Sequence, residues 1–126
     1  IVSIADSSSN QDFIRFDTNQ TISVKAAGET KTVTLDSVMP DDIPFSVIIQ
    51  RDSSHVLRIW IDGVLQSMTV TYNPTRPLDI DTIGCRNGQI SDFNGVIGEV
   101  IVYACSLSGI ETDIQNRLDF IKTQMA

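Results

Sequence analysis

The sequence predicts an all-β domain, an antiparallel β-sandwich or jelly roll, that ends in one amphipathic α-helix. Short segments in which apolar and polar residues alternate recur along residues 1–107, and Gly, Pro, Asn or Asp separates them. This spacing is typical of about nine strands in a sandwich. Residues 109–124 instead carry apolar side chains at helical spacing. We expect the 126 residues to form a single domain.

Four strands are predicted in the first part of the chain. Residues 1–4 are apolar, and residues 13–17 and 21–25 alternate on either side of a tight polar connection, which is typical of a hairpin. Residues 31–35 form the next strand. The side chains expected on the buried faces are Ile14, Phe16, Ile22, Val24, Val33 and Leu35. Residues 36–44, with two prolines and three aspartates, then form a surface loop.

The strongest alternation lies in the centre of the chain. Residues 45–50 and 56–62 alternate, and Asp62-Gly63 supplies the positive φ angles of a tight turn into residues 64–72. Three consecutive antiparallel strands are therefore expected. Their predicted inner faces carry Phe45, Val47, Ile49, Leu57, Ile59, Ile61, Met68, Val70 and Tyr72. Trp60 falls on the opposite, outer face.

Two further strands and the helix complete the predicted chain. Residues 78–84 form a short strand, and residues 93–103 form a long buried strand that is apolar on both faces. Ser108 and Glu111 have the spacing of a capping box, which begins the helix. Its apolar stripe consists of Ile110, Ile114, Leu118, Ile121 and Met125. A helix of about 16 residues is marginal alone in water, so we expect this stripe to pack on the sheets or on a partner chain.

Composition excludes several classes of function. The net charge is −7 and the nine basic residues are scattered, which argues against binding to nucleic acid or to anionic lipid. No apolar run approaches the roughly 20 residues of a membrane-spanning helix. The two cysteines, Cys85 and Cys105, are too far apart for a CxxC metal or redox motif. We expect them to be buried thiols, and a disulfide is the alternative in an oxidising compartment.

Three segments together carry a resemblance to a known family. The first pairs Ile43-Pro-Phe-Ser-Val-Ile-Ile-Gln-Arg-Asp with Leu57-Arg-Ile-Trp-Ile-Asp-Gly-Val-Leu65. The second is Thr82-Ile-Gly-Cys-Arg-Asn-Gly88. The third is Phe93-Asn-Gly-Val-Ile-Gly-Glu-Val-Ile-Val-Tyr103, ahead of the capped helix. In this order they resemble the laminin-G-like, concanavalin A-like lectin jelly rolls over residues 43–124.

The resemblance implies two packed antiparallel sheets and a non-catalytic recognition role that is often directed at carbohydrate. Such modules occur in bacteriophage virion proteins and in secreted bacterial proteins, so the implied location is the virion surface or the extracellular space. The chain is short for this fold, so either strands are missing or a neighbour, such as a second copy in a homo-oligomer, completes the sheet. The N-terminal third matches none of the family's motifs.

We predict no catalytic residues. Glycan-cleaving enzymes with this fold need two carboxylates that flank the scissile bond, whereas Glu29, Glu99 and Glu111 are the only glutamates and are dispersed. Glu111 is assigned to the helix cap, and Glu99 to a structural hydrogen bond. The single histidine, His55, lies in a polar turn and forms no recognisable Ser-His-Asp relay.

The candidate ligand-binding residues are Trp60, Arg58, Arg86, Asn87, Asp92 and Asn94. A sugar ring stacks on an aromatic face while planar polar groups bind its hydroxyls, and Trp60 has Arg58 beside it on the outer face. The alternative is that Trp60 packs under a loop or at an interface and that the other residues only shape turns. We predict no metal ligands and no cofactor. Calcium is the cation that the acids Asp41, Asp42, Asp79 and Asp81 would suit.

Three functions remain open on the sequence. The first is a lectin-like domain that binds carbohydrate or a surface partner. The second is a structural capsid or tail decoration protein that packs against neighbouring virion subunits and has no sugar site. The third is an accessory domain of a polysaccharide-degrading enzyme.

Overall fold

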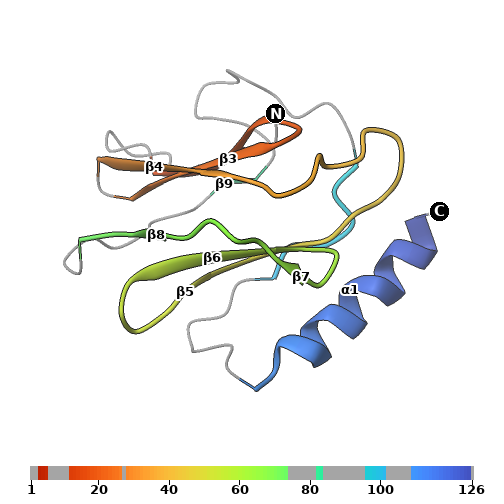
Figure 1. The fold of residues 1–126 in the computed structure, drawn as a ribbon. Coiled ribbons are helices and arrows are strands. Elements are labelled where there is room, and N and C mark those ends of the chain that lie inside the picture. The colour runs from red at the N-terminus through yellow and green to blue at the C-terminus, as the bar shows by residue number, and fades with distance from the viewer. Residues whose placement is uncertain are drawn as a thin grey trace.

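Two antiparallel sheets lie face to face, and one helix packs beside them (Figure 1). The computed structural model describes residues 3–5, 12–26, 28–73, 82–83, 96–101 and 109–125, with side chains for all of these except 3–5 and 82–83. The predicted fold class, antiparallel strands in a sandwich-like arrangement with a C-terminal helix, is confirmed for this part of the chain.

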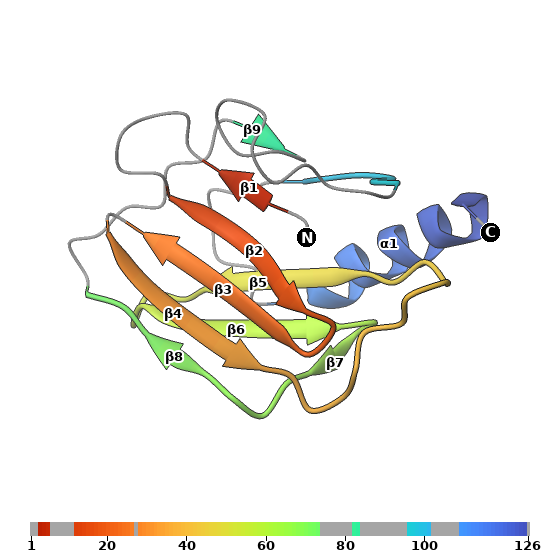
Figure 2. The same ribbon diagram turned by 90° about the horizontal axis from the view of Figure 1, so that it is seen from above.

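The first sheet has the strand order β4-β3-β2-β1-β9. Its strands are β1 (Ser3–Ala5), β2 (Phe13–Thr18), β3 (Thr21–Ala26), β4 (Glu29–Thr34) and β9 (Thr82–Ile83). The predicted hairpin joins β2 to β3, and Gly28, at a φ of 88°, lies in the turn between β3 and β4. β9 pairs with β1, so a segment distant in sequence closes this edge of the sheet (Figure 2).

The second sheet has β6 (Val56–Ile61) at its centre. β5 (Val47–Arg51) pairs along one edge of β6, and β7 (Val64–Leu65) and β8 (Val70–Thr71) pair along the other. The predicted return strand over residues 64–72 is thus divided into two short pieces. Between them the buried Gln66 accepts a hydrogen bond from the Asp36 N–H at 2.9 Å, which binds this edge to the loop of residues 36–44.

The main core fills the space between the two sheets. Ile22 and Ile59, one from each sheet, are fully buried. All of the predicted inner residues of these strands belong to this core or pack against it, with one exception. The exception is Met68, which is 40% exposed, because the chain between β7 and β8 turns toward the loop instead of continuing the ladder. The Tyr72 hydroxyl donates to the Val24 carbonyl at 2.5 Å and so joins the two sheets across the core.

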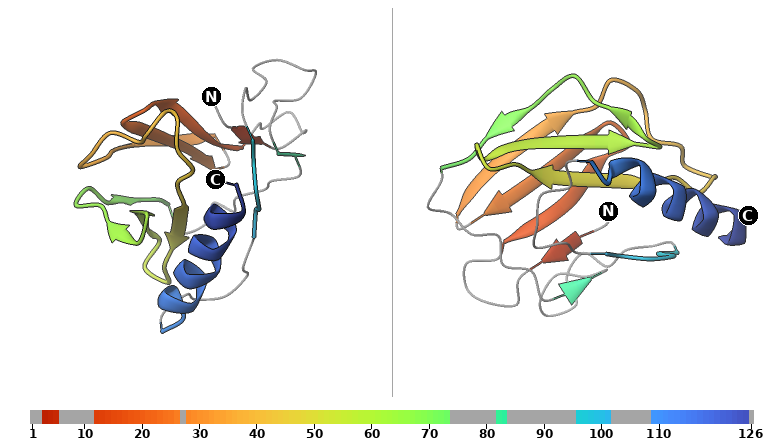
Figure 3. Two further views of the ribbon diagram at one scale, coloured as in Figure 1. Left: turned by 90° about the vertical axis from the view of Figure 1, so that its right-hand side faces the viewer. Right: turned by 90° about the horizontal axis from the view of Figure 1, so that it is seen from below.

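The helix α1 (Glu111–Met125) covers the outer face of the second sheet (Figure 3). It begins two residues after the predicted start at residue 109. The Glu111 carboxylate accepts a hydrogen bond from the Gly109 N–H at 2.8 Å, and the predicted capping partner Ser108 lies outside the described residues. Ile114 is buried against Ile48 of β5, and Ile110, Leu118 and Trp60 pack around this pair. The predicted docking of the apolar stripe on a sheet is therefore confirmed.

Residues 96–101 lie along α1 and belong to no strand, so the prediction of a long buried strand over residues 93–103 is wrong for this stretch. Its contacts are with the helix: Gly98 packs against Ile121 and Met125. The apolar side chains of Val96, Ile97 and Val100 are exposed, and Val96 is the most open at 79%. The rest of the predicted strand lies outside the described residues. None of the described helices is long and apolar enough to cross a membrane.

Candidate functional site

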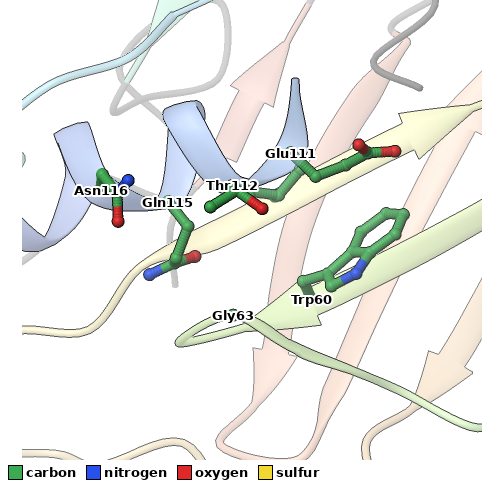
Figure 4. A pocket seen from close by; sticks show the side chains of 7 residues that line it. Trp60, Gly63, Glu111, Thr112, Gln115 and Asn116 are labelled. Carbon is green, nitrogen blue, oxygen red and sulfur yellow. The ribbon is translucent and has the colours of Figure 1, made fainter. Parts of the chain in front are cut away.

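A hollow of about 190 Å³ lies between the outer face of the second sheet and the first turns of α1 (Figure 4). Its lining consists of Ile48, Trp60, Gly63, Glu111, Thr112, Gln115 and Asn116. This volume is below the roughly 300 Å³ at which small-molecule sites begin. The hollow therefore suits a single ring-sized group better than a large ligand.

Trp60 forms the apolar wall of the hollow. Because side chains alternate along β6, burial of Leu57, Ile59 and Ile61 in the core turns Trp60 to the outer face. Its register partners are Ile48 on β5 and Leu65 on β7, so an apolar row crosses the sheet here. The helix covers Ile48, whereas Leu65 remains 49% exposed. Trp60 is consequently half-buried, with part of its indole at the hollow.

The helix supplies the polar wall. Glu111 and Gln115 are four residues apart, as are Thr112 and Asn116, so these side chains project from neighbouring positions on one side of α1. The Gln115 Nε2 donates to Ser46 Oγ at 3.0 Å and to Asp119 Oδ1 at 2.8 Å. These two bonds hold the amide plane in place.

The Gln115 Oε1 is buried and has no hydrogen-bond partner among the described residues. In Figure 4 this oxygen lies on the side of the amide that faces Trp60. An unsatisfied buried acceptor costs about 1–3 kcal/mol. Because the atom is closed to solvent, a ligand in the hollow would reach it only if the Gln115 side chain moved.

The turn between β6 and β7 forms the floor. Asp62 and Gly63 adopt φ angles of 47° and 78°, as predicted for this Asp-Gly pair. A Cβ on Gly63 would lie 3.2 Å from Gln115 Cγ, so glycine allows the helix side chain to approach the turn closely. Asp62 Oδ1 accepts hydrogen bonds from the Ser46 N–H at 2.9 Å and from Lys122 Nζ at 2.5 Å, which fixes the turn relative to the helix.

The carboxylate of Asp62 is held in its charged form. Burial raises the pKa of Asp62, but the hydrogen bonds from Lys122 and Ser46 outweigh burial and leave the pKa below its usual range. The Asp62–Lys122 ion pair therefore persists at neutral pH and keeps the floor of the hollow attached to α1.

The predicted site residues have different outcomes. Trp60 lies on the predicted outer face, but it is a half-buried wall and not an open platform. Arg58 lies on the same face, but its guanidinium is paired with Asp52 and it does not line the hollow. Arg86, Asn87, Asp92 and Asn94 lie outside the described residues.

The sequence interpretation missed the polar wall from α1. Gln115 and Asn116 do not belong to the predicted apolar stripe, but the positions that flank a docked stripe border the surface on which it docks. The available signal was Ile48 next to Trp60, because two apolar outer residues on adjacent predicted strands indicate where the helix would pack.

The four acidic residues that were candidates for binding calcium do not form a cation site in the described part of the chain. Asp41 and Asp42 are exposed in their loop, and Asp79 and Asp81 lie outside the described residues. Among the described side chains, no group of three His, Cys, Asp or Glu is placed to hold a metal ion. Glu99 accepts hydrogen bonds from Arg117 at 2.5 and 3.0 Å.

Comparison of the chain with protein-family models, with curated proteins and with solved structures finds no match.

Proposed function

We propose that the chain is a non-catalytic, lectin-like recognition domain that binds one unit of a carbohydrate in the hollow at Trp60. In this proposal the two sheets belong to a jelly roll of the laminin-G-like, concanavalin A-like kind, displayed on a virion or a secreted protein. The observation that carries the proposal is the opposition of an indole to two carboxamides, Gln115 and Asn116, across a hollow of about 190 Å³.

The chemistry of the two walls supports a sugar ring. The apolar C–H face of a sugar packs on an aromatic ring, which the indole of Trp60 offers. Carboxamides combine donors with an acceptor and suit vicinal hydroxyls. The two bonds of its Nε2 fix the Gln115 carboxamide at the wall of the hollow, and Asn116 supplies the second carboxamide of the lining.

Fluorescence tests this proposal directly, because Trp60 is the single tryptophan in the chain. Titration with mono- and oligosaccharides selected on a glycan array should give a saturable change in emission. Trp60→Ala should abolish binding on the array, whereas Phe120→Ala, which removes an exposed aromatic outside the hollow, should leave it unchanged. The absence of any array ligand, or equal binding by Trp60→Ala, would contradict the proposal.

A second candidate, a structural module that packs against neighbouring virion subunits, is supported by a different surface. Phe120 is 66% exposed and follows Arg117 by three residues on the same flank of α1. Arg117 is paired with Glu99, and Val96, Ile97 and Val100 of that same segment are also exposed. Exposed apolar side chains that gather on one flank are typical of protein contacts.

Light scattering after size-exclusion chromatography distinguishes this candidate. A structural module should form oligomers or bind assembled particles, and Phe120→Asp should reduce that association. A monomer that still binds glycan at Trp60 would favour the lectin-like function instead.

A further inference from the structure

We infer that the hollow selects a sugar that carries a protonated amine, as in a glucosamine unit, over neutral and acidic sugars. This inference rests on the proposed function and concerns the ligand class of the same site. It starts from the charge of the lining. Glu111 is the one ionisable side chain among the seven lining residues, and none of them is Lys, Arg or His.

The basic side chains Lys122 of α1 and Arg58 of β6 already have carboxylate partners. Lys122 is paired with Asp62 and Asp119, at 2.5 and 3.2 Å. Arg58, on the outer face two residues before Trp60, is paired with Asp52. The charge of Glu111 is therefore countered within the described structure only by the Gly109 N–H and the start of the helix. A cation in the hollow would meet a carboxylate that pairs with no basic side chain of the described residues.

Glu111 and Trp60 both line this small space, so a carboxylate and the electron-rich face of an indole border it together. Figure 4 shows the Glu111 side chain extending toward the ring of Trp60. An ammonium group carries three donors and a positive charge, so it can donate to the Glu111 carboxylate while it lies against the ring. A neutral hydroxyl can donate to the same carboxylate, but it has no charge for the carboxylate and the ring to attract.

The N-terminal end of α1 could instead attract an anion, because its free N–H groups carry partial positive charge. Two carboxylates, Glu111 and Asp113, already occupy the first turn. The chain as a whole has a net charge of −7. An acidic sugar would therefore be repelled by the carboxylates at the hollow and by the net negative charge of the whole molecule.

The test is a fluorescence titration of Trp60 with oligomers of equal length made of glucosamine, N-acetylglucosamine, glucose or glucuronic acid. The glucosamine oligomer should bind about tenfold more tightly than the neutral ones, and the preference should fall with added salt. Glu111→Gln, which keeps the capping hydrogen bond, should remove the preference. Asp113 is in the same turn but does not line the hollow, so Asp113→Asn removes an equal charge as a control. This variant should keep the preference for the glucosamine oligomer.

Equal affinity for the neutral and amine oligomers would overturn this inference and leave the proposed function intact. Failure of every oligomer to bind would overturn both. A lysine-rich peptide titrated in parallel separates the two sources of an ammonium group, and tighter binding of the peptide than of the glucosamine oligomer would also overturn the inference. Retention of the preference in Glu111→Gln would show that the carboxylate does not select the ligand.

Discussion

Lys122 Nζ lies 2.5 Å from Asp62 Oδ1, so the later turns of α1 are attached to the turn between β6 and β7. About two helical turns earlier in α1, Gln115 donates a hydrogen bond to the Ser46 hydroxyl. The N–H of Ser46 in turn donates to the same Asp62 carboxylate. Polar bonds thus border the apolar stripe that docks on Ile48. They fix where α1 sits along the sheet, while the apolar contacts supply most of the docking free energy.

Asp62→Asn should weaken this attachment and reduce the acid sensitivity of the fold. Asp62 has a lower pKa in the folded state than when unfolded, so its contribution is complete above about pH 4 and is lost as the pH falls through the folded value. The side chain is 40% exposed, so we expect a loss of only about 0.5–1 kcal/mol at pH 7. Asparagine tolerates the positive φ at this position.

Chemical denaturation between pH 2 and pH 7 checks this prediction. The free energy of unfolding should fall less steeply with acidification in Asp62→Asn than in the parent chain. Identical slopes would mean that the carboxylate contributes nothing to acid unfolding.

Ile114→Asp should destabilise the docked helix by about 3–5 kcal/mol. Ile114 is only 7% exposed, so the substitution would place a charge without a partner in the contact between helix and sheet. Phe120→Asp is the matched control, since Phe120 is on the same helix and 66% exposed, and it should change stability by less than about 0.5 kcal/mol. Urea unfolding followed by circular dichroism measures both. Equal stability of the two variants would show that α1 does not pack through Ile114.

Gly98→Ala should cost about 1 kcal/mol, near the lower end of the range for overpacking, because the half-buried Met125 side chain is flexible and can shift. A Cβ at this position would overlap the Met125 sulfur and lie 3.2 Å from Ile121 Cγ2. Met125→Ala in the same chain should recover part of the loss, because it removes the overlapping atoms. The double-mutant cycle measures this coupling, and purely additive effects would contradict the contact.

Tyr72→Phe should cost about 1 kcal/mol, because it removes the hydroxyl that donates to the Val24 carbonyl across the core. Burial, together with the charge of Glu29, raises the pKa of Tyr72. A phenol whose folded pKa is raised stabilises the folded state less as the pH rises above about 10, its unfolded value. Stability should therefore decline less steeply above that pH in Tyr72→Phe. Unfolding curves at pH 8 and pH 11 test both parts.

The strands and their inner faces were predictable where alternation is strict. Ile22 and Ile59 lie in the core as predicted, because a period of two assigns every side chain of a strand to one face. Met68 was placed on the inner face by the same rule. The rule fails there because Gln66 and Asp36 bind each other and draw the chain away from the ladder. Such a bond between distant residues leaves no periodic signal.

Residues 96–101 show a second limit. Their β-branched composition predicts a buried strand, yet Gly98 lies against the helix and Val96 is exposed. The β-propensity of a residue indicates that it fits a pleated surface, but it does not indicate which element the segment packs against. Part of the hollow was predictable. Trp60 lies on the predicted face, and Ile48 beside it indicates where α1 docks, but the sequence alone does not show that Gln115 then lines the same hollow.

The same helix covers the second sheet and forms the polar wall of the hollow. Ligand binding and helix docking are therefore linked equilibria, since a ligand held by both walls binds only when α1 is docked. A ligand at 100 times its dissociation constant would stabilise the docked state by about 2.7 kcal/mol. The amide hydrogens of α1 should then exchange more slowly with solvent as the hollow fills, even in the turns near Lys122 that touch no ligand.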